Sequence, residues 1–368
     1  MPNDKLHKVI ISGGGTGGHV FPAIAIADAI RRRYPDCEIL FVGAKGRMEM
    51  EKVPAAGYTI EGLNIAGLQR RLTLKNLSFP FKLIGSLLKA RRIVKKFKPQ
   101  AAIGVGGYAS GPTLRAAGNA GIPTFVQEQN SYPGITNKLL AKKALALCVA
   151  YDNMDRFFPA HKIEKTGNPV RKAICEPLPE REAAVNSFGL DPSRKVLFIL
   201  GGSLGAMTLN ESVKAFLENI AEENVQVIWQ CGKYYEADLK PIAGKYKNIH
   251  LTSFIQDMNQ AYAAADVVVS RAGALSVSEL CIVGKPVIFV PSPNVSEDHQ
   301  TKNARALIEK EAAIMISDAE AREKLIPAAL ELIMDVQKCN DLSTAIQELG
   351  IPDADERIVD VIEKHLRL

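Results

Sequence analysis

The 368-residue chain lacks the features that mark several large protein classes. Its six cysteines form no CxxC pair, which argues against a disulfide framework and a zinc site and suits a reducing compartment. No apolar run approaches the roughly 18 residues that a membrane span needs, and no signal-peptide pattern opens the sequence. Hydrophobic residues make up 47% and charged residues 23%, an ordinary folded composition. We therefore expect a soluble protein of two domains.

Acidic residues are missing from one long stretch. None occurs between Glu61 and Glu128, whereas eleven basic residues do. Residues 1–170 hold 25 Lys/Arg against 11 Asp/Glu, a net charge of +14, and the remainder holds 21 against 29, a net charge of −8. Such a basic field is typical of a surface that binds nucleic acid or anionic lipid, and also of a plainly solvated face.

Short apolar runs alternate with helical patterns along the chain, which is typical of parallel sheets crossed by helices. The pattern stops at Asn168-Pro169 and restarts at Lys195, so we place the domain boundary between residues 167 and 168. This gives domains of 1–167 and 168–351, with a C-terminal helix in 352–368 that packs back on the first. The predicted strands are Lys8–Ser12, Ile39–Val42, Ala101–Val105, Thr124–Gln127, Leu145–Ala150, Lys195–Leu200, Gln226–Trp229, Ile249–Leu251, Asp266–Val269 and Pro286–Val290.

A glycine-rich loop, Gly13–His19, stands directly between the first strand and a helix. Glycine lets the backbone approach a ligand closely, and the helix N-terminus behind it offers N–H groups to an anion. Gly13, Gly15 and Gly18 satisfy the GxGxxG spacing of dinucleotide-binding folds. That reading also needs an acidic residue closing the second strand to hold the ribose, and the segment Phe41–Gly46 has none. A nicotinamide dinucleotide is therefore disfavoured.

Three further junctions repeat this arrangement, at Gly104–Pro112, Gly201–Ala206 and Ser270–Glu279. Each alone is compatible with an ordinary tight turn. All four follow strands, and open parallel sheets bind their ligands at the carboxyl ends of strands. We therefore expect a phosphorylated ligand in each half, with the two halves facing across a cleft.

Six segments, GGTGGH at 14–19, GVGGYASGP at 104–112, EQNSYPGITNK at 128–138, GNPVR at 167–171, GGSLGA at 201–206 and AGALSVSE at 272–279, together resemble one family. It is the family of bacterial enzymes that add N-acetylglucosamine to undecaprenyl-pyrophosphoryl-muramyl-pentapeptide, the MurG family. Two positions depart from it, Gln127 where His is common and Leu204 where Gln is common. The resemblance implies an α/β protein with the GT-B fold: two Rossmann-like domains with parallel sheets facing an inter-domain cleft, the first for acceptor and membrane, the second for the donor.

The implied reaction is inverting transfer of N-acetylglucosamine from UDP-GlcNAc to the 4-hydroxyl of the lipid-linked muramyl-pentapeptide, lipid I to lipid II, in the peptidoglycan synthesis that serves cell shape and division. The implied partners are those two substrates, anionic lipid of the cytoplasmic leaflet and other cell-wall synthesis proteins, but no nucleic acid. We expect a peripheral protein on the cytoplasmic face of the inner membrane. No cofactor is implied, and the sequence lacks a DxD metal motif, so no metal site is predicted while an indirect need for a divalent cation stays open.

The resemblance also assigns the substrate contacts. Ser203 donates to a phosphate oxygen, Arg171 contacts the donor, and Glu279 accepts from the ribose hydroxyls. The backbone at Ile255 meets the uracil, Gln300 contacts the donor and Asn130 faces the sugar. The full substrate-binding set is Thr16, Gly17, Gly18, Asn130, Arg171, Ser203, Ile255, Ala274, Leu275, Ser276, Val277, Ser278, Glu279 and Gln300. The loops for the acceptor pyrophosphate contain Gly14, Gly15, Gly106, Gly107 and Tyr108.

For the catalytic base the first candidate is His19, because attack by a sugar hydroxyl needs a proton acceptor that works near neutral pH. Its place at a helix start favours the neutral imidazole. The non-catalytic alternative is a histidine that only caps the loop. Glu128 is the second candidate. A single displacement at the α-linked donor carbon gives a β-1,4 bond without a covalent intermediate.

Apolar and basic residues alternate before and within the helix predicted at Lys82–Lys98, which favours a membrane-surface site. We expect the apolar stripe of that helix to pack on the sheet and residues 68–82 to contact the bilayer. The predicted patch comprises Arg70, Arg71, Leu72, Leu74, Lys75, Leu77, Phe79, Phe81 and Lys82.

Three other classes stay open at this point. One is another GT-B enzyme that uses a UDP-sugar, such as a glycolipid glycosyltransferase or a UDP-GlcNAc 2-epimerase. The second is a non-catalytic membrane adaptor that binds a nucleotide sugar, against which His19, Glu128 and Glu279 speak. The third is an NAD-dependent oxidoreductase, weakened by the missing ribose carboxylate.

Overall fold

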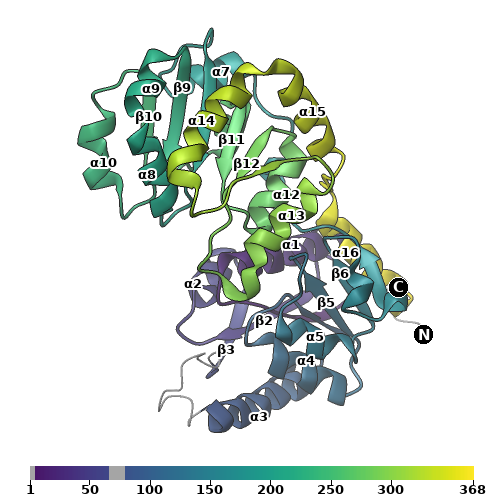
Figure 1. Cartoon of the computed structure of the whole chain (residues 1–368). Helices are drawn as coiled ribbons and strands as arrows, with labels where there is room; N and C mark the ends of the chain where they lie inside the picture. The colour runs from purple at the N-terminus through teal and green to yellow at the C-terminus, as the bar shows by residue number, and fades with distance from the viewer. Residues whose placement is uncertain (1–4, 66–78) are drawn as a thin grey trace. The chain divides into compact units, whose positions relative to one another are not determined.

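The computed structural model describes residues 5–65 and 79–368 and divides the chain into two compact units (Figure 1). The first runs to Arg171 and adds Pro352–Leu368, and the second is Lys172–Ile351. The boundary thus lies four residues beyond the expected one. Asn168 explains the difference, because its buried amide accepts from Gln127 Nε2 at 2.9 Å and donates to the Gln129 carbonyl at 2.9 Å, which fastens this segment to the first unit.

The first unit is built on a seven-stranded sheet in the order β3-β2-β1-β4-β5-β6-β7, with every pairing parallel. Strand β1, third in this order, carries Val9, Ile10 and Ile11, all fully buried, as expected for a strand covered on both faces. The strands are β1 Lys8–Ser12, β2 Glu38–Ala44, β3 Thr59–Leu63, β4 Ala101–Gly104, β5 Thr124–Glu128, β6 Ala146–Val149 and β7 Ile163–Lys165.

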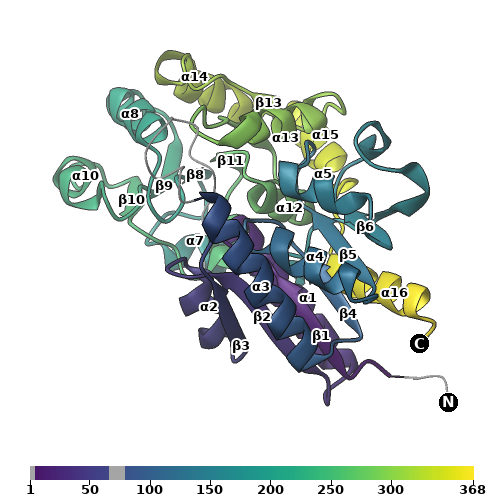
Figure 2. The ribbon, with the colours of Figure 1, turned by 90° about the horizontal axis from the view of Figure 1, so that it is seen from below.

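Helices cover both faces of this sheet. Helices α1 and α16 share one hydrophobic core with it, and α3 and α4, which lie side by side in Figure 2, pack on the other face. The helices are α1 Gly17–Arg33, α2 Glu49–Ala55, α3 Phe79–Phe97, α4 Ser110–Asn119, α5 Ile135–Ala141 and α16 Ala354–Leu366, with 3-10 turns at Met154–Arg156 and Ala160–Lys162.

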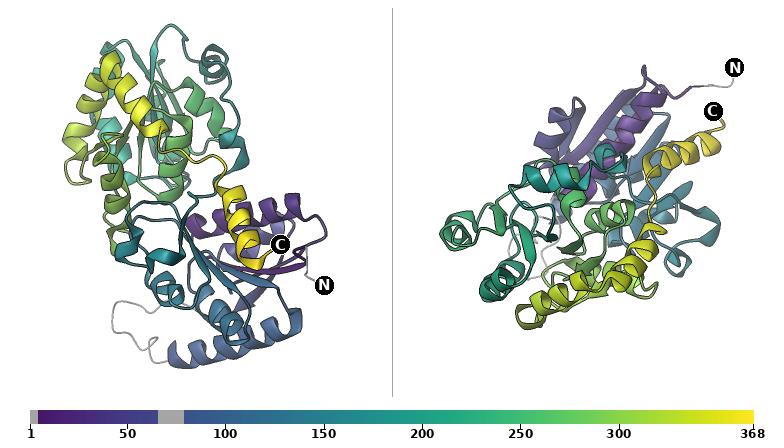
Figure 3. Two further views of the ribbon diagram at one scale, coloured as in Figure 1. Left: turned by 90° about the vertical axis from the view of Figure 1, so that its right-hand side faces the viewer. Right: turned by 90° about the horizontal axis from the view of Figure 1, so that it is seen from above.

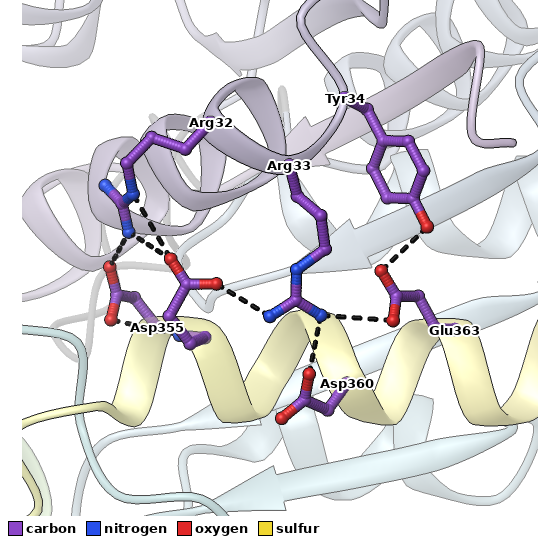
Figure 4. Close-up of polar contacts among 7 residues, drawn as sticks. Arg32, Arg33, Tyr34, Asp355, Asp360 and Glu363 are labelled. Atoms are coloured by element: carbon purple, nitrogen blue, oxygen red, sulfur yellow. Dashed lines mark hydrogen bonds and ion pairs between the residues drawn. The ribbon is translucent and has the colours of Figure 1, made fainter.

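The C-terminal helix α16 lies beside α1, as expected for the terminal segment (Figure 3). Its apolar side, including Ile358, Val359 and Ile362, is buried in the first unit. Its polar side meets the last turn of α1 in a set of ion pairs drawn in Figure 4. There Arg32 pairs with Asp355 and Glu356, Arg33 pairs with Glu356, Asp360 and Glu363, and Tyr34 donates to Glu363 at 2.7 Å.

The second unit contains a six-stranded parallel sheet in the order β10-β9-β8-β11-β12-β13. Helices α8 and α14 pack on one face, and α7 and α11 pack together on the other. The strands are β8 Lys195–Leu200, β9 Val225–Gln230, β10 Ile249–Thr252, β11 Val267–Ser270, β12 Val287–Phe289 and β13 Ile314–Met315. The helices are α6 Lys172–Cys175, α7 Arg181–Ser187, α8 Met207–Ala215, α9 Leu217–Glu222, α10 Glu236–Ala243, α11 Met258–Ala264, α12 Ala274–Val283, α13 His299–Ile308, α14 Ala321–Met334 and α15 Val336–Gln347, with a 3-10 turn at Ser296–Asp298.

Both sheets reverse their winding direction beside their first strand. The reversal lies between β1 and β4 in the first unit and between β8 and β11 in the second. Ligands of doubly wound sheets bind at this switch point, outside the carboxyl ends of the strands. The four predicted glycine junctions follow these same four strands. Each unit therefore has one pair of glycine-containing loops at its switch point.

Candidate active site

In the first unit the two glycine loops lie against each other. A Cβ added to Gly107 would overlap the Gly14 carbonyl, and one added to Gly106 would lie 2.6 Å from His19 Cδ2. Both glycines also have positive φ, 94° and 84° for Gly106 and Gly107, a backbone region that side chains disfavour. The predicted acceptor loops thus form one site, whose contact surface requires glycine on both sides.

His19 lies in the first turn of α1, half-buried, with its ring over Gly106. Its Nδ1 lies 3.1 Å from the hydroxyl of Thr16, the N-cap residue of that helix. A hydrogen bond at Nδ1 orients the imidazole. The arrangement brings the predicted base, Thr16 and the helix start at Gly17 and Gly18 together.

Glu49, the first residue of α2, is a member of this site that the sequence analysis missed. Its carboxylate is fully buried and accepts hydrogen bonds from Gly15 N–H and Ala44 N–H, both at 2.9 Å. A carboxylate does therefore lie near the end of the second strand, but it faces the glycine loop. The Gly15 N–H, in the loop predicted for the acceptor pyrophosphate, is thus engaged by a side chain of the protein itself.

Glu128, the second candidate base, is also buried, at the end of β5. Burial raises the pKa of this carboxyl, and the hydrogen bonds that it accepts oppose the rise. Oε1 accepts from the Asn130 N–H at 3.0 Å and its amide at 3.2 Å, and Oε2 accepts from Asn137 Nδ2 at 2.8 Å and Gly134 N–H at 3.2 Å. Both oxygens are thus engaged in holding the loop that carries Asn130.

Gln127, one of the two positions that depart from the resemblance, joins a buried amide network. Its Nε2 donates to Asn168, and its Oε1 accepts from Gln129, which in turn donates to the Val105 carbonyl at 2.8 Å. This network connects the segment after β5 to the second glycine loop. The departure from the family pattern is therefore a structural contact beside the site.

In the second unit the loop Gly201–Ala206 packs against the segment that follows β9. A Cβ on Gly205 would overlap the Cys231 carbonyl, and one on Gly232 would overlap the backbone of Gly205. Ser203 lies exposed in this loop, and so does Leu204, with 54% of its surface accessible. The sequence analysis missed Gly232, because its place beside this loop is evident only from its contact with Gly205.

A second missed feature connects four loops at the same edge of this sheet. Arg271 pairs with Asp318 and donates to the Val290 carbonyl at 3.0 Å, and Asp318 also accepts from the Thr208 hydroxyl at 3.0 Å. These residues follow β11, β13, β12 and β8 respectively. The ion pair thus holds together the loops that surround the predicted donor site.

The predicted nucleotide contacts on α12 differ in their placement. Glu279 is buried, and its Oε2 accepts from the Tyr262 hydroxyl at 3.3 Å. The Val277 side chain lies in the core, and its N–H donates to the Gly273 carbonyl. The Ser278 hydroxyl donates to Ala274 O at 3.0 Å, within the helix. Ala274, Leu275 and Ser276 form the half-buried first turn.

Two other residues predicted to contact the donor take part in hydrogen bonds that involve a backbone N–H group. The Ile255 N–H donates to Gln230 Oε1 at 3.1 Å, and Gln300 Oε1 accepts from the Ser292 N–H at 2.8 Å. Arg171 and Tyr108 are exposed, and both belong to the first unit. Within residues 5–65 and 79–368, no group of three or more His, Cys, Asp or Glu side chains is arranged to hold a metal ion.

The predicted membrane patch lies mostly outside the described residues. Arg70, Arg71, Leu72, Leu74, Lys75 and Leu77 belong to the segment 66–78, and the side chain of Phe79 is also outside the description. Phe81 is 78% exposed and Lys82 is half-buried.

The prediction that the whole apolar stripe of α3 packs on the sheet was wrong, because Ile84 and Leu88 are 57% and 62% exposed. Ala90, Ile93 and Val94 fill the positions that face the sheet. In the described part of the chain no helix is long and apolar enough to cross a bilayer.

The chain matches two family models, the glycosyltransferase family 28 N-terminal domain over residues 9–149 and the C-terminal domain over residues 196–358. It is 58% identical over 362 residues to the UDP-N-acetylglucosamine–N-acetylmuramyl-(pentapeptide) pyrophosphoryl-undecaprenol N-acetylglucosamine transferase of Cytophaga hutchinsonii, covering 98% of both chains. The enzyme of the same name from Bacteroides fragilis is 58% identical over 351 residues, 94% of this chain and 92% of the relative.

Solved structures agree with these matches. The crystal structure of Acinetobacter baumannii MurG superposes with a TM-score of 0.79 at 29% identity, covering 97% of this chain and 99% of that one. A UDP-GlcNAc 2-epimerase from Neisseria meningitidis, bound to UDP-GlcNAc, superposes with a TM-score of 0.67 at 14% identity over 97% of this chain and 100% of that one, which shows a shared fold alone. The fold is therefore GT-B, and the chain belongs to the MurG family within glycosyltransferase family 28.

Proposed function

We propose that this enzyme transfers N-acetylglucosamine from UDP-GlcNAc to the lipid-linked muramyl-pentapeptide, converting lipid I to lipid II in peptidoglycan synthesis. One observation carries the proposal, the 58% identity over 98% of the chain to a transferase of this name. The paired glycine loops at both switch points support it, since the reaction uses two substrates that each contain a pyrophosphate.

On the donor side, we assign the leaving UDP to the second unit. Charge develops on the diphosphate as the glycosidic bond breaks, and fixed N–H dipoles stabilise it without a metal ion. The N-termini of α8 and α12 follow the two loops at this switch point and supply such dipoles. We assign a hydroxyl donor to Ser203 and the acceptor for the ribose hydroxyls to Glu279 on α12.

On the acceptor side, we assign the proton transfer to His19. The Thr16 hydroxyl contacts its Nδ1 and orients the imidazole for this role. Glu128 suits a positioning role better, because both its oxygens are engaged by the loop around Asn130. The hydroxyl attacks the anomeric carbon as UDP leaves, which inverts the α linkage to β.

The acceptor pyrophosphate then has fewer partners than the sequence indicated. With the Gly15 N–H held by Glu49, the nearby donors for an anion are the N–H groups of Gly17 and Gly18 at the start of α1. The loop of Gly106, Gly107 and Tyr108 lies against the same site.

We also propose that the first unit works at the cytoplasmic face of the membrane, where its lipid substrate is. Helix α3 exposes Phe81, Ile84 and Leu88 along one side. Its exposed cations, Arg91, Arg92, Lys95 and Lys96, add attraction to anionic lipid. An apolar stripe beside cations is the pattern of an interfacial helix.

The transfer assay combines purified protein, labelled UDP-GlcNAc and one of two acceptors, the muramyl-pentapeptide lipid or a diacylglycerol. We expect label only in the muramyl lipid. Label in the diacylglycerol would favour a glycolipid enzyme, and conversion of the donor to UDP-N-acetylmannosamine without transfer would favour an epimerase.

Vesicle flotation tests the membrane surface separately. The double variant Ile84→Gln/Leu88→Gln should bind anionic vesicles roughly tenfold more weakly. The matched control, Leu204→Gln, removes an equally exposed leucine from the other unit and should bind as the wild type does. Equal binding by all three proteins would reject α3 as the membrane surface.

A further inference from the structure

Glu49 holds the glycine loop of the first unit in place through the backbone. Its carboxylate accepts from Gly15 N–H in the loop and from Ala44 N–H at the end of β2, each at 2.9 Å. Hydrogen bonds to a charged acceptor are about twice as strong as neutral ones. One side chain thus connects the loop after β1, the second strand and helix α2.

Two glycines beside this carboxylate leave the space that it occupies. A Cβ on Gly14 would overlap the carboxylate, and one on Gly43 would lie 2.6 Å from Glu49 Cγ. Glycine at these two positions therefore makes the space that the buried side chain fills. Within the described residues no Lys or Arg pairs with Glu49, so its charge is stabilised by the two backbone N–H groups.

Burial without a cation is costly for a carboxylate unless its hydrogen bonds are well made. A solvated glutamate would avoid that cost, as Glu51 does two residues later on the same helix, where it is exposed beside Lys52. The retained buried charge thus points to a role in the loop that it contacts. The loop leads directly into Thr16 and His19, which are connected at 3.1 Å.

We propose that Glu49 is a positioning residue for transfer: it fixes the Gly14–Gly15 backbone and thereby sets the place of His19 against the acceptor hydroxyl. It touches neither substrate. The inference rests on the proposed function, because His19 is assigned as the base there. Since misplacing a reacting group by about 1 Å can cost about a hundredfold in rate, a loosened loop lowers turnover without changing the donor site.

The test uses the full-length enzyme with Glu49→Gln, which keeps the shape of the side chain. Its Nε2 is a donor, so one of the two N–H groups loses its acceptor. We expect kcat to fall about 10- to 100-fold, with the KM for UDP-GlcNAc and the UDP affinity within about twofold of wild type. The matched control Glu51→Gln should keep wild-type kcat.

Amide hydrogen exchange supplies the readout that global destabilisation would not produce. In Glu49→Gln, the amides of Gly15 and Ala44 should exchange faster, while those of Ile10 and Ile11 in strand β1 stay protected. A second variant, Gly43→Ala, displaces Glu49 sterically and should lower kcat in the same selective way.

Two results would overturn the inference. The first is a kcat of Glu49→Gln that equals the kcat of an active wild-type enzyme. That result would leave the proposed function intact. The other is a parallel loss of kcat, UDP affinity and thermal stability in both variants, which would mean that Glu49 only supports the fold. If the wild-type enzyme itself transfers no sugar, the proposed function fails instead.

Discussion

His19 and Glu128, the two candidate bases, differ in their hydrogen-bond partners. His19 was the first candidate because imidazole accepts a proton near neutral pH, and Glu128 was the second. In the structure the Nδ1 of His19 contacts the Thr16 hydroxyl, whereas each oxygen of Glu128 accepts two hydrogen bonds, which come from Asn130, Gly134 and Asn137. Sequence spacing predicts that such residues lie near a site, but only the contacts tell a reacting group from a supporting one.

Replacing the base should separate chemistry from donor binding. His19→Ala is expected to lower kcat about 100- to 10,000-fold, the usual contribution of general base catalysis. The UDP affinity, measured by calorimetry, should change little. His161→Ala removes an exposed histidine of the same unit and serves as the control. Unchanged turnover in His19→Ala would remove it as the base and return attention to Glu128.

Glu279 provides the corresponding test in the second unit. Glu279→Gln removes the charge that we propose accepts from the ribose, an interaction worth about 1.5–3 kcal/mol. The KM for UDP-GlcNAc should therefore rise about 10- to 100-fold, measured at saturating acceptor. Tyr262→Phe, which removes only the hydroxyl that donates to Glu279, should raise it far less. A normal KM in Glu279→Gln would place the ribose elsewhere.

Glu49 and Arg271 are two residues whose contacts could not be predicted from the sequence. Glu49 follows the second strand by five positions, and its orientation depends on the space left by Gly14 and Gly43. Arg271 stands inside a recognised segment, yet its partner Asp318 lies 47 residues further along the chain. Long-range contacts of this kind carry no local pattern, so motif spacing locates the loops but leaves their internal supports undetected.

At the scale of elements, the predicted strands were found in the structure, apart from their ends, and the terminal helix expected in 352–368 was found at Ala354–Leu366. Three strands were missed, β3, β7 and β13, and all three lie at sheet edges. Edge strands are short and partly solvated, so they lack the continuous apolar runs of buried strands. Thr59–Leu63 includes Glu61, and Ile163–Lys165 has one apolar residue in three.

The contact between α1 and α16 yields a stability prediction. Arg33 reaches Glu356, Asp360 and Glu363, so its loss removes a network and not one exposed pair. Arg33→Met should lower the free energy of unfolding by about 1–2 kcal/mol in urea denaturation at low salt. The exposed pair of Arg357 with Asp353 lies within α16, and Arg357→Met should cost less than about 0.5 kcal/mol. Equal losses would show that the network adds nothing.

Tyr34 makes the same contact sensitive to alkaline pH. Burial, together with the hydrogen bond to Glu363, raises the pKa of its hydroxyl from 10.0 to about 12. A raised pKa means that this stabilisation is complete below about pH 10 and is lost as the pH rises through about 12. The unfolding free energies of wild type and Tyr34→Phe should therefore converge over that range. Tyr234→Phe, at an exposed position, should match wild type throughout.

For the molecule as a whole, the charge asymmetry agrees with the division of tasks between the units. The basic half, with net charge +14 over residues 1–170, contains the predicted membrane surface, and the acidic remainder contains the loops assigned to UDP-GlcNAc. Composition alone left nucleic acid and lipid equally open. The family match and the exposed apolar side of α3 together favour lipid, because nucleic acid does not require apolar side chains beside the cations.

The most direct test of this account is the structure of the product sugar. The disaccharide is cleaved from the lipid after reaction with UDP-GlcNAc, and its linkage is determined by NMR. We predict N-acetylglucosamine joined β-1,4 to the muramyl residue, as single displacement at an α-linked donor requires. An α linkage, or attachment at a hydroxyl other than position 4, would contradict the mechanism that assigns the base to His19.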